Sequence, residues 1–246
     1  MRYLWIIILT IIILWYLFKR LLFPTKTVNH FDISKSPFRE LEVSQNDHLA
    51  IISIMKRLDR LMKENNVEYF LIAGSLMGAL RYNNRMPWDD DIDIGILSRQ
   101  SFESLPFSKY DLAIRKVWFG YKVFDVNNNR RVLLESTFPF IDVFMFIKTG
   151  DSVSYESDKA RKTWPRESIK LEYLYPLGIC NYAGMSIPCP GKSDKFLTQA
   201  FPGWDTTAYI GGSHTGKPLF RNYKMPINSI TSSEVQEYLK LLSKKK

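Results

Sequence analysis

The sequence feature that most constrains the fold is a run of carboxylates between two apolar segments. Asp89, Asp90, Asp91 and Asp93 fall within five residues, between the apolar stretches 70–73 and 92–97. Like charges this close repel one another, so a cation has to neutralise them, and a divalent metal ion takes carboxylate oxygens as ligands. Asp91 and Asp93 alternate with two isoleucines, which is strand spacing, and Asp89 has the same parity. The run therefore predicts a strand with the metal ligands Asp89, Asp91 and Asp93. The alternative is a solvated acidic turn.

A Gly-Ser pair precedes the acidic run by about fifteen residues. The expected order is a strand over 67–73, then Gly74 and Ser75, then a short helix over about 76–82. Free N–H groups at a helix start and the helix dipole favour a phosphate oxygen, and glycine lets the backbone approach closely. We therefore predict that Gly74 and Ser75 bind a substrate phosphate that faces the metal site. By itself, the pair would indicate only a plain strand-turn-helix.

A third acidic position lies inside the apolar segment 140–147, which alternates enough to be a strand. A lone Asp142 there is costly unless it is paired or metal-bound. Given the first acidic run, we interpret Asp142 as a third carboxylate of the site. The alternative is a satisfied structural carboxylate.

The string "AGSLMGALRYNNRMPWDDDIDIGI" resembles the LicD family, which includes bacterial phosphocholine transferases, fukutin and fukutin-related protein. "FPFIDVFMF" (138–146) is similar to the family's third acidic strand, and "YPLGICNYAGMSIPCPGKSDKFLTQAFPGW" (175–204) to its C-terminal segment. The resemblance covers about 48–205. It departs from the family at 201–204, where the family has Tyr-Gly and a later Trp. It implies an α/β (α+β) nucleotidyltransferase-like fold, a mixed sheet backed by helices.

The resemblance also implies a reaction: transfer of a phospho-alcohol, such as phosphocholine or ribitol phosphate, from a CDP-alcohol to a sugar hydroxyl of a glycan, with release of CMP. Asp89, Asp91 and Asp93 would hold Mg²⁺ or Mn²⁺. Asp142 would complete that site or accept the acceptor's proton. Arg81 would steady the leaving nucleotide phosphate, with Lys122, Arg130 and Arg131 as weaker candidates. The predicted catalytic set is Asp91, Asp93 and Asp142.

Three other functions are compatible with parts of the pattern. The same carboxylates serve enzymes that move a nucleoside monophosphate. A glycosyltransferase also uses Asp-x-Asp, but the Gly-Ser turn before the acidic strand belongs to the nucleotidyltransferase arrangement. A non-catalytic membrane-tethered scaffold is the third alternative, and the retained Gly-Ser turn and acidic positions speak against it.

The N-terminus predicts a membrane anchor. Residues 4–18 are apolar apart from Thr10, and no small-x-small cleavage site follows them. We expect a single-pass anchor over 1–23, a stem over 24–46 and a catalytic domain over 47–246. Flanking charges slightly favour a cytoplasmic body, whereas the family resemblance implies a lumenal one in the ER or Golgi. The net charge of +9 suits a nucleotide or an acidic membrane surface. Without a basic, aromatic-interleaved stripe, nucleic-acid binding is not expected.

Further elements follow from periodicity and turn signals. Helices are expected from 47 to about 65, over 98–107, 193–201 and 234–242, and strands over 111–116, 119–126 and 132–136. Residues 205–226 indicate a loop. Trp88 is interpreted as a packing residue, His48 as a surface residue and His214 as a solvated loop residue. Cys180 and Cys189 form either a disulfide or two free thiols.

Overall fold

The computed structural model describes residues 26–27, 45–86, 88–132, 135–210, 214 and 223–227. The predicted anchor over 1–23, most of the predicted stem and the predicted helix over 234–242 lie outside these residues. Within the described part of the chain, none of the helices has the length and apolar character needed to cross a membrane.

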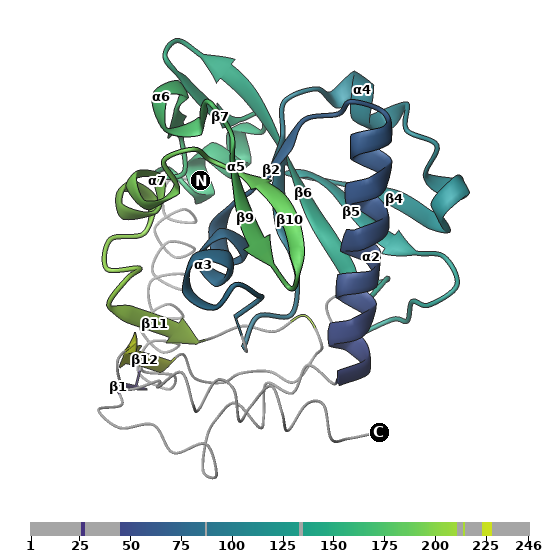
Figure 1. Ribbon diagram of the computed structural model, residues 1–246, viewed down its shortest axis with the longest axis horizontal. Coiled ribbons are helices and arrows are strands. Elements are labelled where there is room, and N and C mark those ends of the chain that lie inside the picture. The colour runs from purple at the N-terminus through teal and green to yellow at the C-terminus, as the bar shows by residue number, and fades with distance from the viewer. Residues whose placement is uncertain are drawn as a thin grey trace, which may run out of the picture.

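A mixed sheet forms the centre of the molecule (Figure 1). Its main strands lie in the order β2 (Tyr69–Leu71), β3 (Asp93–Ile96), β6 (Phe140–Thr149), β5 (Gly120–Asp125) and β4 (Leu112–Val117). β3 runs parallel to β6, and the other neighbours in this order are antiparallel. The far end of β6 pairs with β7 (Ser152–Tyr155), which in turn pairs with β8 (Ile169–Lys170). The predicted mixed sheet with helices is confirmed.

Helix α2 (Gln45–Glu64) packs on the sheet over β5 and β6 (Figure 1). Six of its apolar side chains recur at helical spacing and are fully buried: Ile51, Ile54, Met55, Leu58, Leu61 and Met62. The remaining helices are shorter: α3 (Ala73–Tyr82), α4 (Arg99–Glu103), the 3₁₀ turn η3 (Phe107–Tyr110), α5 (Asp158–Thr163), α6 (Leu171–Leu174) and α7 (Ser193–Ala200). Helix α3 begins three residues earlier than predicted, so Gly74 and Ser75 lie in its first turn.

A disulfide-linked hairpin packs beside the sheet. Strands β9 (Gly178–Tyr182) and β10 (Met185–Cys189) are antiparallel, and a bond joins Cys180 to Cys189 with their Cα atoms 6.0 Å apart. β10 contacts β2, and β9 contacts α3. The open choice between a disulfide and two thiols is thus settled in favour of the disulfide.

Two element predictions were wrong. The described residues of the segment 132–136 form no strand, and the backbones of Val132 and Glu135 bond to each other. The loop expected over 205–226 contains β11 (Thr207–Ile210) and β12 (Tyr223–Pro226), and β12 also pairs with β1 (Lys26–Thr27) of the predicted stem. For β11 and β12, pairing with each other and with β1 decided the backbone conformation over local composition.

Candidate active site

Three of the predicted carboxylates meet where β3 and β6 begin. The parallel register places Asp93 directly opposite Asp142, and the Asp142 N–H donates to the Ile92 carbonyl at 2.8 Å. Asp91 lies just before β3 rather than inside it. Asp91, Asp93 and Asp142 each offer an oxygen, and these oxygens lie within 4.8 Å of one another. Strand pairing therefore gathers three carboxylates from distant parts of the chain.

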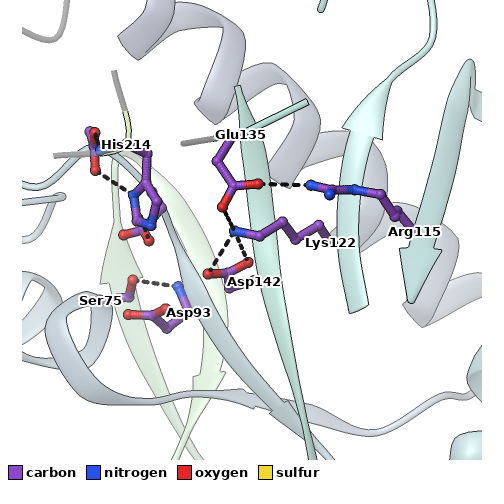
Figure 2. A network of polar contacts seen from close by, with 9 residues as sticks. Ser75, Asp93, Arg115, Lys122, Glu135, Asp142 and His214 are labelled. Atoms are coloured by element: carbon purple, nitrogen blue, oxygen red, sulfur yellow. Dashed lines mark hydrogen bonds and ion pairs between the residues drawn. The ribbon is translucent and has the colours of Figure 1, made fainter. Parts of the chain in front are cut away.

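Asp142 lies beside a buried lysine (Figure 2). The Lys122 Nζ is 3.0 Å from Asp142 Oδ1 and 3.1 Å from Glu135 Oε1, and Arg115 binds Glu135 at 2.8 Å. Lys122 and Asp142 are paired residues of β5 and β6, so the strand register fixes their contact. Lys122 is therefore a partner of Asp142, and its contact with a nucleotide phosphate stays a prediction.

Gly74 and Ser75, which are predicted to bind a substrate phosphate, each contact one of the acidic residues. The Ser75 hydroxyl accepts a hydrogen bond from the Asp93 N–H at 2.7 Å and so fixes the start of β3. A Cβ at Gly74 would lie 2.9 Å from Asp89 Oδ2, so glycine is needed for the Asp89 carboxylate to approach the first turn of α3. The positive end of the helix dipole suits that carboxylate. Asp89 belongs to neither of the groups of potential metal ligands found among the described residues.

Burial and mutual repulsion raise the pKa values of these carboxyl groups. Burial, then the charge of Asp91, holds the pKa of Asp89 and of Asp93 well above its usual range. Burial also raises the pKa of Asp91, against the nearby charge of His214. The pKa of Asp142 rises to about 7 through burial, although Lys122 acts in the opposite direction. Such a site favours the arrival of a cation.

His214 reaches this cluster, which corrects its interpretation as a solvated loop residue. Its backbone N–H donates to Asp90 Oδ2 at 2.6 Å, and its Nδ1 lies 3.0 Å from Asp90 Oδ1 and 3.6 Å from Asp91 Oδ2. Burial by itself would lower the pKa of His214, but the bond to Asp90 and the charge of Asp91 raise it to about 9. A lone histidine in a Gly-rich stretch gives no local signal of this contact, so the sequence reasoning missed both His214 and Asp90.

Arg85 is a third residue that the sequence reasoning missed. It is buried, and its guanidinium lies against His48 Nδ1, with nitrogen atoms at 3.1 and 3.3 Å. Burial, then the charge of Arg85, lowers the pKa of His48 to about 4, so His48 is a half-buried neutral partner and not a surface residue. Arg85 also acts to lower the pKa of Asp89. It thus supplies part of the positive charge that balances the acidic run.

The other predicted side chains lie at the edges of this region. Arg81, at the end of α3, donates to the Thr207 carbonyl at 3.2 Å and so ties α3 to β11. Its role in substrate binding stays a prediction. Arg130 forms two bonds to Asp47, at 2.5 and 2.8 Å, and Arg131 is exposed. Trp88 is buried and meets the Tyr82 ring edge-on, which agrees with its interpretation as a packing residue.

Comparison with known proteins places this site within a family domain. The model of the LicD/FKTN/FKRP nucleotidyltransferase domain matches residues 66–192, which include every predicted site residue and exclude His214. An uncharacterized protein of Rickettsia prowazekii is 24% identical over 82% of this chain and 73% of its own length. One of Rickettsia typhi is 24% identical over 76% of this chain, which spans only 57% of that relative.

The human Ribitol 5-phosphate transferase FKRP is 25% identical over 57% of this chain and 29% of its own length. Among solved structures, the crystal structure of ANT(2")-Ia in complex with adenylyl-2"-tobramycin covers 78% of this chain and 96% of its own. It is 13% identical with a TM-score of 0.38, a likeness too low to bear on function. Since the family model matches more than half of the sequence, the chain belongs to the LicD/FKTN/FKRP family and carries its nucleotidyltransferase domain.

Proposed function

We propose that this protein is a metal-dependent transferase that moves a phospho-alcohol from a CDP-alcohol to a sugar hydroxyl of a glycan and releases CMP. Family membership and the relative named Ribitol 5-phosphate transferase support this class of reaction. The observation that carries the proposal is the register of β3 and β6, which sets Asp93 against Asp142 with Asp91 beside them. In the reaction, the acceptor oxygen forms a bond to the alcohol-bearing phosphorus, the bond from that phosphorus to the CMP oxygen breaks so that CMP leaves, and the hydroxyl proton passes to water.

The donor set fits a magnesium or manganese ion. Asp91, Asp93 and Asp142 present hard oxygen ligands within 4.8 Å of one another, and two of these side chains are buried. A bound ion would neutralise charge on the diphosphate of the donor. Asp89 also belongs to the predicted metal set, and its carboxylate lies against Gly74, so its part in metal binding stays a prediction.

The protein's own residues prepare the site. Ser75 holds the start of β3, and Lys122 holds the carboxylate of Asp142. Burial raises the pKa of Asp142 to about 7, and the Lys122 ammonium, within 3.3 Å of both Asp142 oxygens, acts in the opposite direction and so supports the ionised form that a metal ligand requires. This contact favours the first of the two roles considered for Asp142.

We also propose a single-pass membrane protein whose body lies in the lumen of the ER or Golgi. The apolar segment 4–18 supports the anchor. The bond between Cys180 and Cys189 supports an oxidising compartment for the body, because disulfides persist there.

The reaction is tested by CMP release from CDP-choline, CDP-ribitol and CDP-glycerol, each with a mixed glycan acceptor and Mg²⁺ or Mn²⁺. We expect release from one donor, its loss in EDTA, and a decrease of at least about 100-fold in Asp91→Asn. Asp151→Asn, in the exposed turn after β6, is the matched control and should keep full activity.

Other outcomes separate the alternatives. Release of pyrophosphate from a nucleoside triphosphate, with no CMP from any CDP-alcohol, would identify a nucleoside monophosphate transferase. No turnover and no nucleotide binding, with a partner protein retained by both the wild type and Asp91→Asn, would identify a scaffold and contradict the proposal.

A further inference from the structure

Charged side chains of alternating sign lead from the edge of the sheet to the acidic site (Figure 2). Arg115 on β4 contacts Glu135, Glu135 contacts Lys122 on β5, and Lys122 contacts Asp142 on β6. Burial increases inward: the side chain of Arg115 is 36% exposed, that of Glu135 13% and that of Lys122 5%. Charge interactions strengthen as water is excluded, so the innermost pair is the strongest link in this chain of charges.

The ammonium group of Lys122 contacts three side chains of the protein. An ammonium has three N–H donors. Two of its directions are taken by Asp142 and Glu135, and the Nζ also lies 3.4 Å from the centre of the Phe140 ring, close enough for a cation–π contact. These contacts direct the ammonium of Lys122 toward groups of the protein itself.

We propose that Lys122 is a positioning residue: it fixes the carboxylate of Asp142 in the orientation in which Asp142 binds the metal ion, and Glu135 holds Lys122 in place. This inference rests on the proposed function, because it takes Asp142 to be a metal ligand. Replacing a residue that orients a metal ligand typically weakens metal binding by about 10- to 100-fold. A lysine also repels a metal ion, but here the carboxylate of Asp142 lies against the ammonium and attracts both cations. Loss of Lys122 would leave Asp142 as a buried charge without its partner.

The experiment is a titration of the purified full chain with Mn²⁺, without donor or acceptor, followed by electron paramagnetic resonance of free Mn²⁺. We expect Lys122→Met to bind Mn²⁺ about 10- to 100-fold more weakly than the wild type. Asp142→Asn should show a loss of similar size. In the double variant Lys122→Met/Asp142→Asn, the affinity should lie within about threefold of that of Asp142→Asn, because two residues that act through one contact are not additive.

Arg57→Met is the matched control, since it removes another partly buried ion pair, to Asp125, outside this charge chain. It should lower the melting temperature and leave Mn²⁺ affinity unchanged. If Lys122→Met does not fold, Glu135→Gln carries the test, and it should weaken Mn²⁺ binding by about three- to tenfold.

Several results would overturn the inference. One is a folded Lys122→Met with wild-type or tighter affinity, or, if that variant does not fold, a folded Glu135→Gln with wild-type affinity. Another is a double variant whose loss is the product of the two single losses, which would show that Lys122 acts independently of Asp142. In these cases Mn²⁺ binding by the wild type would leave the proposed function standing. A wild type that binds no Mn²⁺ would instead contradict the metal dependence of that function, and this inference with it.

Discussion

Ser75 shows how one side chain serves the fold and the site together. Its hydroxyl is fully buried and accepts from the Asp93 N–H at 2.7 Å. Ser75→Ala would leave that buried N–H without its acceptor, so we expect the free energy of unfolding to fall by about 1–3 kcal/mol. Urea denaturation measures this change. Ser104→Ala removes an exposed hydroxyl and should stay within about 0.5 kcal/mol of the wild type. Equal effects in both variants would contradict a special role for Ser75.

Glu167 is a buried carboxyl group whose charge should make stability depend on pH. Its Oε2 accepts from the Tyr155 hydroxyl at 2.5 Å, and burial raises its pKa to about 7. Because the folded state holds this proton more tightly than the unfolded chain, the contribution of Glu167 is fully present below about pH 4.5. It is lost as the pH rises through about 7. Glutamine keeps an acceptor for Tyr155 and carries no charge.

We therefore expect Glu167→Gln to match the wild type near pH 4.5 and to exceed it near pH 8, by an amount on the order of 3 kcal/mol. Thermal or urea unfolding at several pH values measures the difference. Glu172→Gln, which removes a surface carboxylate, is the control. A Glu167→Gln advantage that is the same at both pH values would show that the Glu167 charge is not its source.

At the scale of elements, the close approach of β5 to β6 depends on Gly120. Its φ is +155°, and a Cβ there would lie 2.0 Å from the Val143 carbonyl oxygen. We expect Gly120→Ala to lower the free energy of unfolding by at least about 3 kcal/mol, because backbone would have to move. Gly150 also has a positive φ, +61°, but a Cβ there would meet nothing within 4 Å. Gly150→Ala should therefore cost only about 1 kcal/mol. Similar melting temperatures for the two variants would contradict this explanation.

Most of the central elements could be predicted because each carries its own periodic signal. The apolar spacing of α2 follows from the face that it buries, and the apolar run around Asp142 follows from a strand that is buried on both faces. Partnerships between elements leave no such signal. The contact of Lys122 with Asp142 depends on the register of β5 against β6, and His214 reaches Asp90 through the path of a segment without regular spacing. The sequence did not predict β11 and β12 for the same reason, because each of these strands is defined by its pairing with a neighbouring strand.

At the scale of the whole molecule, the β9–β10 hairpin is held by its disulfide and braces β2 and α3. A loop closed by residues nine apart loses chain entropy worth about 2–3 kcal/mol in the unfolded state. We expect Cys180→Ser/Cys189→Ser to lower the free energy of unfolding by about that amount in denaturant titrations. Dithiothreitol should shift the wild type toward the double variant and leave the double variant unchanged. An unshifted wild type would contradict the prediction.

The placement of α2 has a practical consequence for choosing the boundaries of an expressed fragment. The family segment covers 66–192, yet the six fully buried side chains of α2 come before it and His214 comes after it. A fragment trimmed to residues 66–192 would lack α2, and the apolar face of the sheet that α2 covers would be exposed to solvent. It would also lack His214, which contacts Asp90. The segment that the family model matches is thus smaller than the unit that keeps α2 and His214 together with the sheet.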